Sequence, residues 1–393
     1  MNRGEHLDVL VVGAGVYVTG RGTPGYGTIL PALLEGRRCG LVRRITIAAT
    51  RETSLEEAGK RAATLGGLMK VDGTVQCVLA PAGLPAGNDQ PSAAIVSVPD
   101  RVHADAAVPL LERGISCLVV KPFATTLRDA RRMCQAAERG RAYGAVEFHK
   151  RWDAANVRLR EELQAGRLGV PLYAVIEFSQ KKQVPLEHFR AWAHQTNVFQ
   201  YLGVHYVDLL MFATGYRPEA VVACGQRVRL AQEGIDTEDA IQVMIRWKTP
   251  SGVPFVSTHL THWIDPDRGS AMSDQRITVV GTLGHYRSDQ KDRGIQMVTD
   301  ERGIEDLNPY FSSLSYDPAI GAQRCWGYGP DSILAFLGDV ADLRGGRRTA
   351  AELDEIRPSF ASALVSTAVI EAAGESLKRD GAWVQVADVS AQP

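Results

Sequence analysis

The chain has 393 residues, more than a single hydrophobic core usually organises, so we expect two domains. Apolar residues make up 45% and charged residues 23% of the sequence, which is typical of a globular protein that folds in water. With 44 basic and 45 acidic side chains the net charge is −1, so neither a nucleic-acid partner nor a basic membrane-binding patch is indicated.

The six cysteines are widely scattered and include no Cys-x-x-Cys pair, which indicates reduced thiols. The first residues lack the apolar segment of a signal peptide, and no run approaches the roughly 20 apolar residues of a membrane span. We therefore expect a cytoplasmic protein with no membrane partner. His259 and His262 fall on an expected strand, where positions i and i+3 face opposite sides, so we expect no metal site.

The first third of the chain alternates short apolar runs with amphipathic segments. The runs are expected to be buried strands at residues 8–12, 45–49, 93–98, 117–120 and 142–148, and the segments helices at 54–65, 104–113 and 127–139. This β-α-β repetition predicts an α/β fold with a doubly wound parallel sheet, the Rossmann arrangement. Ser54 is expected to cap its helix, with Glu57 three residues later. Residues 70–90 are expected to form an irregular insertion.

Within this part, Gly13-Ala14-Gly15 directly follows the first expected strand. Gly13 permits a tight turn, and Gly15 allows the backbone to approach a pyrophosphate, so both glycines and Val16 are candidate cofactor contacts. Val18 occupies the place of the fingerprint's third glycine, and the glycine-rich residues 19–27 are expected to delay or distort the following helix. A generic glycine turn is the alternative interpretation.

Thr50 and Arg51 stand at the end of the second strand, where NAD-binding proteins place an acidic residue for the ribose diol. An arginine at this position suits a 2′-phosphate, which favours NADP. Glu52 could still serve the diol of NAD. We therefore expect NAD(P)H as cofactor, with a preference for NADP.

Lys121-Pro122 follows the apolar run 115–120. Ligands of open α/β sheets lie outside the carboxyl ends of the strands, and the proline ends the strand there. An ammonium in such a crevice can neutralise a substrate oxygen, hold a phosphate or act as a base with a shifted pKa. The alternative is a surface lysine at the start of a loop.

Beyond about residue 150, segments with alternating apolar and polar residues replace the continuous apolar runs. Strands of a largely antiparallel sheet are expected at 172–178, 220–223, 240–247, 255–260, 275–280 and 295–299, and helices at 158–165, 198–212, 331–344 and 359–378. We expect a dinucleotide-binding domain at residues 1–148. Residues 149–393 are expected to form an α/β domain for substrate binding and oligomerisation, with terminal helices able to pack back on the first domain.

Tyr201, His205 and Asp208 are spaced i, i+4 and i+7, which places them on one face of the expected helix 198–212. Three polar groups on an otherwise apolar helix are costly unless they are hydrogen-bonded or line a wet cavity. They are therefore candidate acid–base residues. A histidine such as His205, taken alone, is more often a satisfied core histidine.

Four further residues are candidate substrate contacts. His149, Arg151 and Trp152 follow the strand that ends at residue 148, and Trp192 precedes the polar helix closely enough to wall the same pocket. A solvated basic turn is an equally good interpretation of the first three.

The ordered motifs resemble those of the Gfo/Idh/MocA oxidoreductases. The matching segments are Val98-Pro99 with His103 (Pro-Asn-x-x-His), Lys121-Pro122 (Glu-Lys-Pro), Lys150-Arg151-Trp152 (Arg-Arg-Phe), Gly203-Val-His205-x-x-Asp208 (Gly-x-His-x-x-Asp) and residues 276–284 (a late strand ending in Gly-x-x-Gly). The resemblance implies a nicotinamide-binding Rossmann domain and an α/β domain built on an open, mostly antiparallel sheet. It also implies a homodimer or homotetramer, and substrates such as sugars, cyclitols or nucleotide sugars. Val98, Pro99, His103, Lys121 and Pro122 would then lie at the cofactor.

Three positions depart from the family pattern. Val120 replaces the glutamate of Glu-Lys-Pro, Val18 the third glycine, and Tyr201 the aspartate four residues before the histidine. The last change leaves the proton acceptor open between two groups. We expect His205 as general acid/base, because imidazole titrates near neutral pH, and Lys121 as the electrostatic clamp on the reacting oxygen. Tyr201 is then a positioning group or an alternative base.

The expected function is NAD(P)-dependent hydride transfer to or from a secondary alcohol or ketone of a polyhydroxylated ring. One alternative keeps a tightly held NAD and uses oxidation transiently, for glycoside elimination or epimerisation, with no net cofactor turnover. Another is a non-catalytic, nucleotide-sensing regulatory protein on the same fold. Retention of Lys121 and His205 argues against this last alternative.

Overall fold

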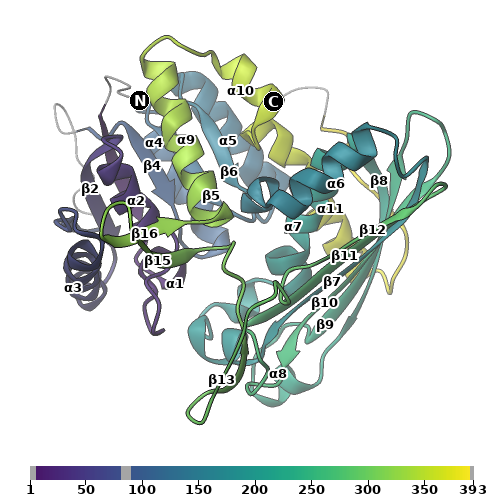
Figure 1. Ribbon diagram of the computed structural model, residues 1–393. Helices are drawn as coiled ribbons and strands as arrows, with labels where there is room; N and C mark the ends of the chain where they lie inside the picture. The colour runs from purple at the N-terminus through teal and green to yellow at the C-terminus, as the bar shows by residue number, and fades with distance from the viewer. Residues whose placement is uncertain (1–5, 81–89, 390–393) are drawn as a thin grey trace. The chain divides into compact units, whose positions relative to one another are not determined.

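The computed structural model describes residues 6–80 and 90–389, which form two compact units (Figure 1). Unit 1 contains the chain up to Ala124 together with Arg128–Trp152 and Tyr310–Ala363. Unit 2 contains Thr125–Leu127, Asp153–Pro309 and the chain from Leu364 onward. Unit 1 therefore includes a late segment that lies far beyond residue 148 in the sequence.

Unit 1 is built on a six-stranded parallel sheet with the order β3-β2-β1-β4-β5-β6. The strands are β1 (Leu7–Val12), β2 (Val42–Ala49), β3 (Gln76–Leu79), β4 (Ala93–Val96), β5 (Ser116–Val120) and β6 (Gly144–Glu147). The order reverses on either side of β1 and β4, as in a doubly wound sheet. The predicted Rossmann-type parallel sheet is thus confirmed.

The edge strand β3 corrects one expectation from the sequence. It lies inside residues 70–90, which we expected to be irregular, and it pairs with β2 from Thr46↔Gln76 to Ala49↔Leu79. Three of its four residues are exposed, so it lacks the apolar run by which the buried strands were recognised. Residues 81–89 of the expected insertion lie outside the described part of the chain.

Helices accompany these strands along the chain. They are α1 (Val16–Thr19), α2 (Ile29–Arg38), α3 (Glu52–Met69), α4 (His103–Leu111), α5 (Leu127–Gly140), α9 (Tyr328–Arg344) and α10 (Ala350–Ile356). The expected Ser54 cap is wrong, because α3 begins at Glu52 with Arg51 at its N-cap position. The Ser54 hydroxyl accepts a hydrogen bond from Arg21 instead.

The core of unit 1 explains the continuous apolar runs. Side chains of β1 and β2 such as Leu7, Val9 and Ile47 are buried together with Leu33 of α2 and Leu337 of α9. A parallel strand covered by helices on both faces is therefore a nearly continuous apolar run. Each such side chain stabilises the fold by about 1.5–3 kcal/mol when it leaves water. A hairpin of β15 (Ser313–Asp317) and β16 (Ala322–Trp326) precedes α9.

Unit 2 is built on a seven-stranded sheet with the order β12-β11-β7-β10-β9-β8-β17. The strands are β7 (Pro171–Lys181), β8 (Arg217–Gln226), β9 (Ala240–Lys248), β10 (Phe255–Asp265), β11 (Ser273–Gly281), β12 (His285–Asp289) and β17 (Val384–Gln385). Every pairing in it is antiparallel except that of β10 with β7. The predicted mostly antiparallel sheet is confirmed.

The expected strand at 295–299 does not join this sheet. It is β13 (Gln296–Thr299), which pairs only with β14 (Gly303–Asp306) in a separate two-stranded hairpin. All four residues of β13 are exposed. Its alternating pattern therefore marks a hairpin and not a half-buried sheet strand.

Helical segments cover one face of the unit 2 sheet (Figure 1). They are α6 (Ala154–Gln164), α7 (Val204–Thr214), the short α8 (Arg229–Gln232) and α11 (Phe360–Lys378), which belongs to this unit from Leu364 onward. Val207 of α7 and Val369 of α11 are buried in the same core as Ile176 and Ile245 of the sheet. Among the described residues, α11 alone is long and apolar enough for a membrane span, and 61% of that stretch is buried inside the protein.

Candidate active site

The glycine turn after β1 has the geometry of a dinucleotide cradle. Gly13 has φ +113°, and a Cβ there would lie 2.0 Å from the carbonyl oxygen of Ser97, so only glycine fits. At Gly15 the position of a Cβ faces open space, with no heavy atom within 4 Å. Gly15 and Val16 are both exposed. The backbone of this turn can therefore be approached closely from outside, as binding of a pyrophosphate requires.

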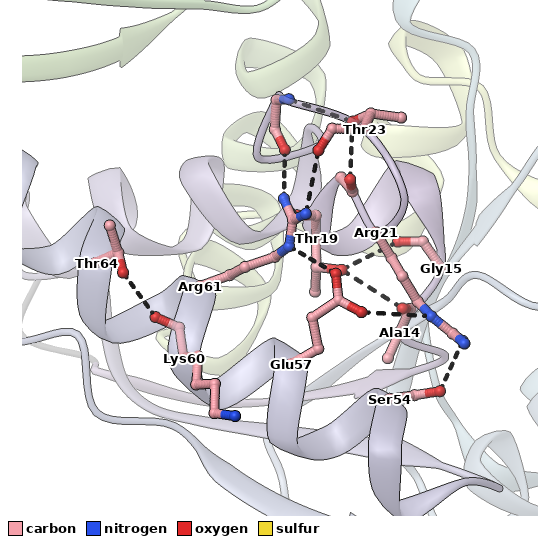
Figure 2. Close-up of polar contacts among 12 residues, drawn as sticks. Ala14, Gly15, Thr19, Arg21, Thr23, Ser54, Glu57, Lys60, Arg61 and Thr64 are labelled. Atoms are coloured by element: carbon pink, nitrogen blue, oxygen red, sulfur yellow. Dashed lines mark hydrogen bonds and ion pairs between the residues drawn. The ribbon is translucent and has the colours of Figure 1, made fainter.

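The helix after this turn is interrupted, as the sequence predicted. α1 ends at Thr19 after one turn, and a loop of residues 20–28 precedes α2. Arg61 of α3 holds the loop in place (Figure 2), because its guanidinium donates to the carbonyl oxygens of Thr19, Gly25 and Thr23 at 3.3, 2.6 and 3.1 Å. Glu57, one turn earlier on α3, accepts from Arg61 Nε at 2.9 Å. The loop is therefore a defined part of unit 1.

Two arginines lie near the carboxyl end of β2. Arg51 and its neighbour Thr50 are exposed directly after that strand. Arg21, from the loop after α1, donates a 2.7 Å hydrogen bond to Ser54 in the first turn of α3 (Figure 2). Sequence analysis missed Arg21. The signal that could have found it is a basic residue inside the glycine-rich segment that follows the dinucleotide turn.

The loops after β4 and β5 are joined by His103. Its Nδ1 lies 2.9 Å from the Pro122 carbonyl oxygen and its Nε2 lies 3.0 Å from that of Val98. Burial lowers the pKa of His103, although the nearby Asp100 carboxylate opposes this shift. The imidazole is fully buried. The His103 side chain therefore supports the two loops, and its contact with the cofactor stays a prediction. Val98 and Pro99 are partly exposed.

Lys121 lies where the sequence predicted it, directly after β5 and partly buried. Burial lowers the pKa of its ammonium to about 8, although the carboxylates of Asp100 and Glu147 act in the opposite direction. A lysine with a pKa this close to neutrality can lose its proton under mild conditions. Such groups are concentrated at functional sites.

His149 is enclosed in unit 1. Its Nδ1 lies 2.9 and 3.0 Å from the two Glu147 carboxylate oxygens, and its ring lies 5.1 Å from Phe311 and 5.6 Å from Tyr328 between centroids. The side chain is buried. The structure thus gives His149 a set of protein partners, and the prediction that it contacts substrate gains no support.

Arg151 and Trp152 remain partly exposed after His149, in the 3-10 turn His149–Trp152. The Arg357 guanidinium lies 6.0 Å above the Trp152 ring, a cation–π contact within unit 1. Trp152 and Arg357 line a small cavity together with Glu147 and Ser332. The substrate contacts expected of Arg151 and Trp152 stay predictions.

Unit 2 carries the polar helix, but its start differs from expectation. Residues Phe199–Gly203 form a π-helical turn, and regular α-helix begins only at Val204, so the i, i+4 spacing of Tyr201 does not describe a uniform α-helix. A Cβ at Gly203 would lie 2.3 Å from the Phe199 ring, so this wide turn needs glycine to pack. His205 and Asp208 follow on α7 and are both buried.

Tyr201 belongs to an aromatic group in unit 2. Its ring centroid lies 5.1 Å from that of Phe189, 6.3 Å from Trp192 and 6.2 Å from Trp263. Trp192 and Tyr201 are thus neighbours, and the wall of a substrate pocket that Trp192 would form stays a prediction. The candidate residues thus fall into two sets, one in each unit. Within the described ranges, no group of three or more His, Cys, Asp or Glu side chains is placed to hold a metal ion.

A parallel sheet with a glycine cradle after its first strand, in a chain whose second unit is a mostly antiparallel α/β sheet, defines the class of two-domain dinucleotide-dependent oxidoreductases. The model of an oxidoreductase family with an NAD-binding Rossmann fold matches residues 55–148. The model of the GFO/IDH/MocA C-terminal domain matches residues 156–287. The chain therefore belongs to the Gfo/Idh/MocA oxidoreductase family. The first match begins after the glycine turn and its loop.

Similar proteins have names that agree with this family. The chain is 27% identical over 150 residues to the rhizopine catabolism protein MocA of Rhizobium meliloti, an alignment covering 38% of this chain and 46% of that protein. It is 25% identical over 215 residues to the myo-inositol 2-dehydrogenase of Thermotoga maritima, covering 54% and 60%. The chain thus spans about half the length of the curated relatives it matches.

A solved structure supports the fold over nearly the whole chain. The crystal structure of GenD2 from gentamicin A biosynthesis, in complex with NAD, superposes with a TM-score of 0.72 and 20% sequence identity. The superposition covers 98% of this chain and 97% of GenD2. At this identity the likeness shows a shared fold.

Proposed function

We propose that this protein is an NAD(P)-dependent oxidoreductase that acts on a secondary alcohol or ketone of a sugar, nucleotide sugar or cyclitol. One observation carries the proposal: Lys121, a partly buried cation, follows β5 in the same unit as the open glycine cradle after β1. A cofactor cradle and a strand-end cation are two features that support hydride transfer at an oxygen-bearing carbon.

The glycine cradle fits a dinucleotide because its backbone can be approached closely at Gly15. Gly15 leaves the space in which a pyrophosphate lies, and Val16 is exposed beside it. When bound, the nicotinamide supplies the site that accepts or delivers hydride. We propose that Gly13, Gly15 and Val16 hold the pyrophosphate, and that Val98, Pro99 and Pro122 border the cofactor.

Lys121 is proposed to stabilise the negative charge that develops on the substrate oxygen. A preorganised cation needs no reorganisation during the reaction, and its effect is strongest where water is excluded. His205 is proposed to take the hydroxyl proton as oxidation proceeds and to return it in reduction. Asp208 would orient His205, and Tyr201 is a positioning group or the alternative base.

The substrate class is proposed from residue chemistry and from relatives. Trp192, beside Tyr201, and Trp152 offer flat apolar faces of the kind that pack against sugar or cyclitol rings, and Arg151 offers hydrogen-bond donors for hydroxyl groups. One relative is a myo-inositol 2-dehydrogenase. We further propose a cytoplasmic homodimer or homotetramer. The oligomer is supported by the second face of the unit 2 sheet, which exposes residues such as Tyr173 and Met244.

The cofactor is proposed to be NADP in preference to NAD. Arg51 and Arg21 supply two guanidinium groups near the end of β2, and guanidinium pairs with phosphate in a bidentate manner. Glu52, also exposed there, is the feature that would serve NAD. The NAD-bound GenD2 structure shows that this fold also accommodates the nucleotide without a 2′-phosphate.

A two-step experiment tests the function. The nucleotide that co-purifies with the protein is first identified by mass spectrometry. A panel of sugars, nucleotide sugars and cyclitols is then followed at the absorbance of reduced nicotinamide. Net reduction of cofactor with a ring alcohol is the expected result. Substrate conversion without net cofactor change would indicate transient redox chemistry, and nucleotide binding without any conversion would contradict an enzymatic role.

A further inference from the structure

The residue directly before Lys121 is uncharged. Val120 stands where the Glu-Lys-Pro motif has glutamate, so the residue preceding the lysine cannot neutralise the ammonium. The sheet, however, pairs Val120 of β5 with Glu147 of β6 as direct Cα partners. Neighbouring parallel strands lie about 4.8 Å apart. A carboxylate is therefore present on β6, directly opposite Val120, the position at which the motif has glutamate.

Glu147 is held in a fixed orientation. It is 2% exposed, accepts a hydrogen bond from Ser332 Oγ at 2.8 Å, and lies 2.9 Å from His149 Nδ1. Tyr17 also faces it, and the pKa of that phenol is raised by burial and by the Glu147 charge, so Tyr17 stays protonated. A buried carboxylate with three polar neighbours is preorganised, because its rotamer is set before any ligand binds.

We propose that Glu147 is the positioning residue that keeps Lys121 protonated, in place of the carboxylate missing at position 120. The inference rests on the proposed function of Lys121 as a cationic clamp. An opposite charge nearby favours the charged form of a group that burial would otherwise neutralise. Asp100 is the second carboxylate whose charge acts on the ammonium.

The other charged side chains of this region are Asp100, Arg357, Asp339 and Lys150. Asp100, which is buried, acts on both Lys121 and His103. Arg357 and Asp339, which line the cavity beside Glu147, form an ion pair with each other at 2.6 Å. Lys150, also buried, follows His149 in the chain. Because Glu147 and Asp100 are the two carboxylates whose charges act on Lys121, the experiment compares variants at both positions.

The test titrates Lys121 itself, without substrate or cofactor. The purified protein is labelled with an amine-acylating reagent at a series of pH values, and the modified fraction of Lys121 is measured by peptide mass spectrometry. Glu147→Gln should lower the labelling midpoint from its wild-type value by about one pH unit. Asp100→Asn measures how much the second carboxylate raises the labelling midpoint of Lys121. Glu138→Gln, an exposed substitution on α5, is the matched control and should leave the midpoint unchanged.

A carboxylate swap sharpens the test. Val120→Glu combined with Glu147→Gln moves the carboxylate to the neighbouring strand and should return the midpoint toward the wild-type value. Should Glu147→Gln not fold, Val120→Glu alone adds a second carboxylate and should raise the midpoint. An unchanged midpoint in a folded Glu147→Gln protein, or in Val120→Glu, would overturn the proposal. A shifted midpoint in a protein that converts no ring alcohol would instead leave Glu147 in its role and refute the proposed function.

Discussion

Arg21 Nη1 donates a 2.7 Å hydrogen bond to Ser54 Oγ, which fixes the loop after α1 against the first turn of α3. The bond holds the guanidinium of Arg21 against Ser54, which lies three residues after Arg51 in the sequence. Arg21 also pairs with Glu57 at 3.6 Å. A cofactor phosphate at this position would have to compete with that carboxylate for Arg21, whereas Arg51 is exposed at the N-cap position of α3.

Arg51→Ala should therefore reduce NADP affinity about 10-fold or more while NAD affinity changes little, since a charge-assisted hydrogen bond contributes about 1.5–3 kcal/mol. Arg21→Ala should weaken NADP binding less, because Arg21 is already paired. Calorimetric titration of both variants with both nucleotides checks this. An unchanged preference in the double variant would assign the 2′-phosphate role to neither arginine.

Gly15→Leu should abolish measurable dinucleotide binding without unfolding unit 1. The added side chain would point into open space, so the protein tolerates it, but it would occupy the approach to the pyrophosphate. Gly59→Ala, at a helical glycine in α3 that also faces open space, is the control. It should retain binding and raise stability by up to about 1 kcal/mol. Equal binding by the Gly15 variant would mean that the cofactor lies elsewhere.

Lys121→Ala should lower turnover by about 10²–10³-fold, as does the loss of one oxyanion-stabilising donor, while nucleotide affinity falls much less. Because the pKa of Lys121 is about 8, the wild-type enzyme should also lose turnover as the pH rises through that value and the clamp becomes neutral. Steady-state rates with a confirmed substrate measure both effects. Near-normal turnover of the variant would make the lysine structural.

Lys121→Met should stabilise the protein at pH 7 by about 1–3 kcal/mol, because the wild-type fold desolvates a charge that methionine lacks. The sign of the pH dependence follows from the lowered pKa. Between pH 8 and the usual lysine range, the folded state has released the proton that the unfolded state still binds, so wild-type stability rises with pH. Urea denaturation at pH 7 and pH 9.5 should show the advantage of Lys121→Met shrinking. An advantage independent of pH would point to packing alone.

His205→Asn should cost about 10²–10⁴-fold in turnover and flatten the loss of oxidation rate at low pH, if His205 takes the proton. Tyr201→Phe keeps the ring among Phe189, Trp192 and Trp263 and removes only the hydroxyl, so it should cost less and keep the pH profile. Profiles of both variants must be measured with the same substrate, since coupled groups titrate together. The reverse pattern would transfer the role of base to Tyr201.

The sequence by itself determined the features whose physical cause is local. Strands covered on both faces are nearly continuous apolar runs, so β1, β2, β4 and β5 were visible in the sequence. Lys121 could be predicted as a site residue because a charge directly after such a strand has no packing role. The family resemblance likewise rests on short ordered motifs, and the family models confirm it.

Only the tertiary structure decided which residues from distant segments meet. The pairing of Val120 with Glu147 depends on strand register between segments separated by α5, and no local period encodes that register. The enclosure of His149 depends on Phe311 and Tyr328, which come from a late segment of the chain. The π-helical turn before His205 depends on how the Phe199 ring packs over Gly203. Local patterns reveal which residues are buried, whereas the partner that a buried charge or ring meets is set by packing between segments far apart in sequence.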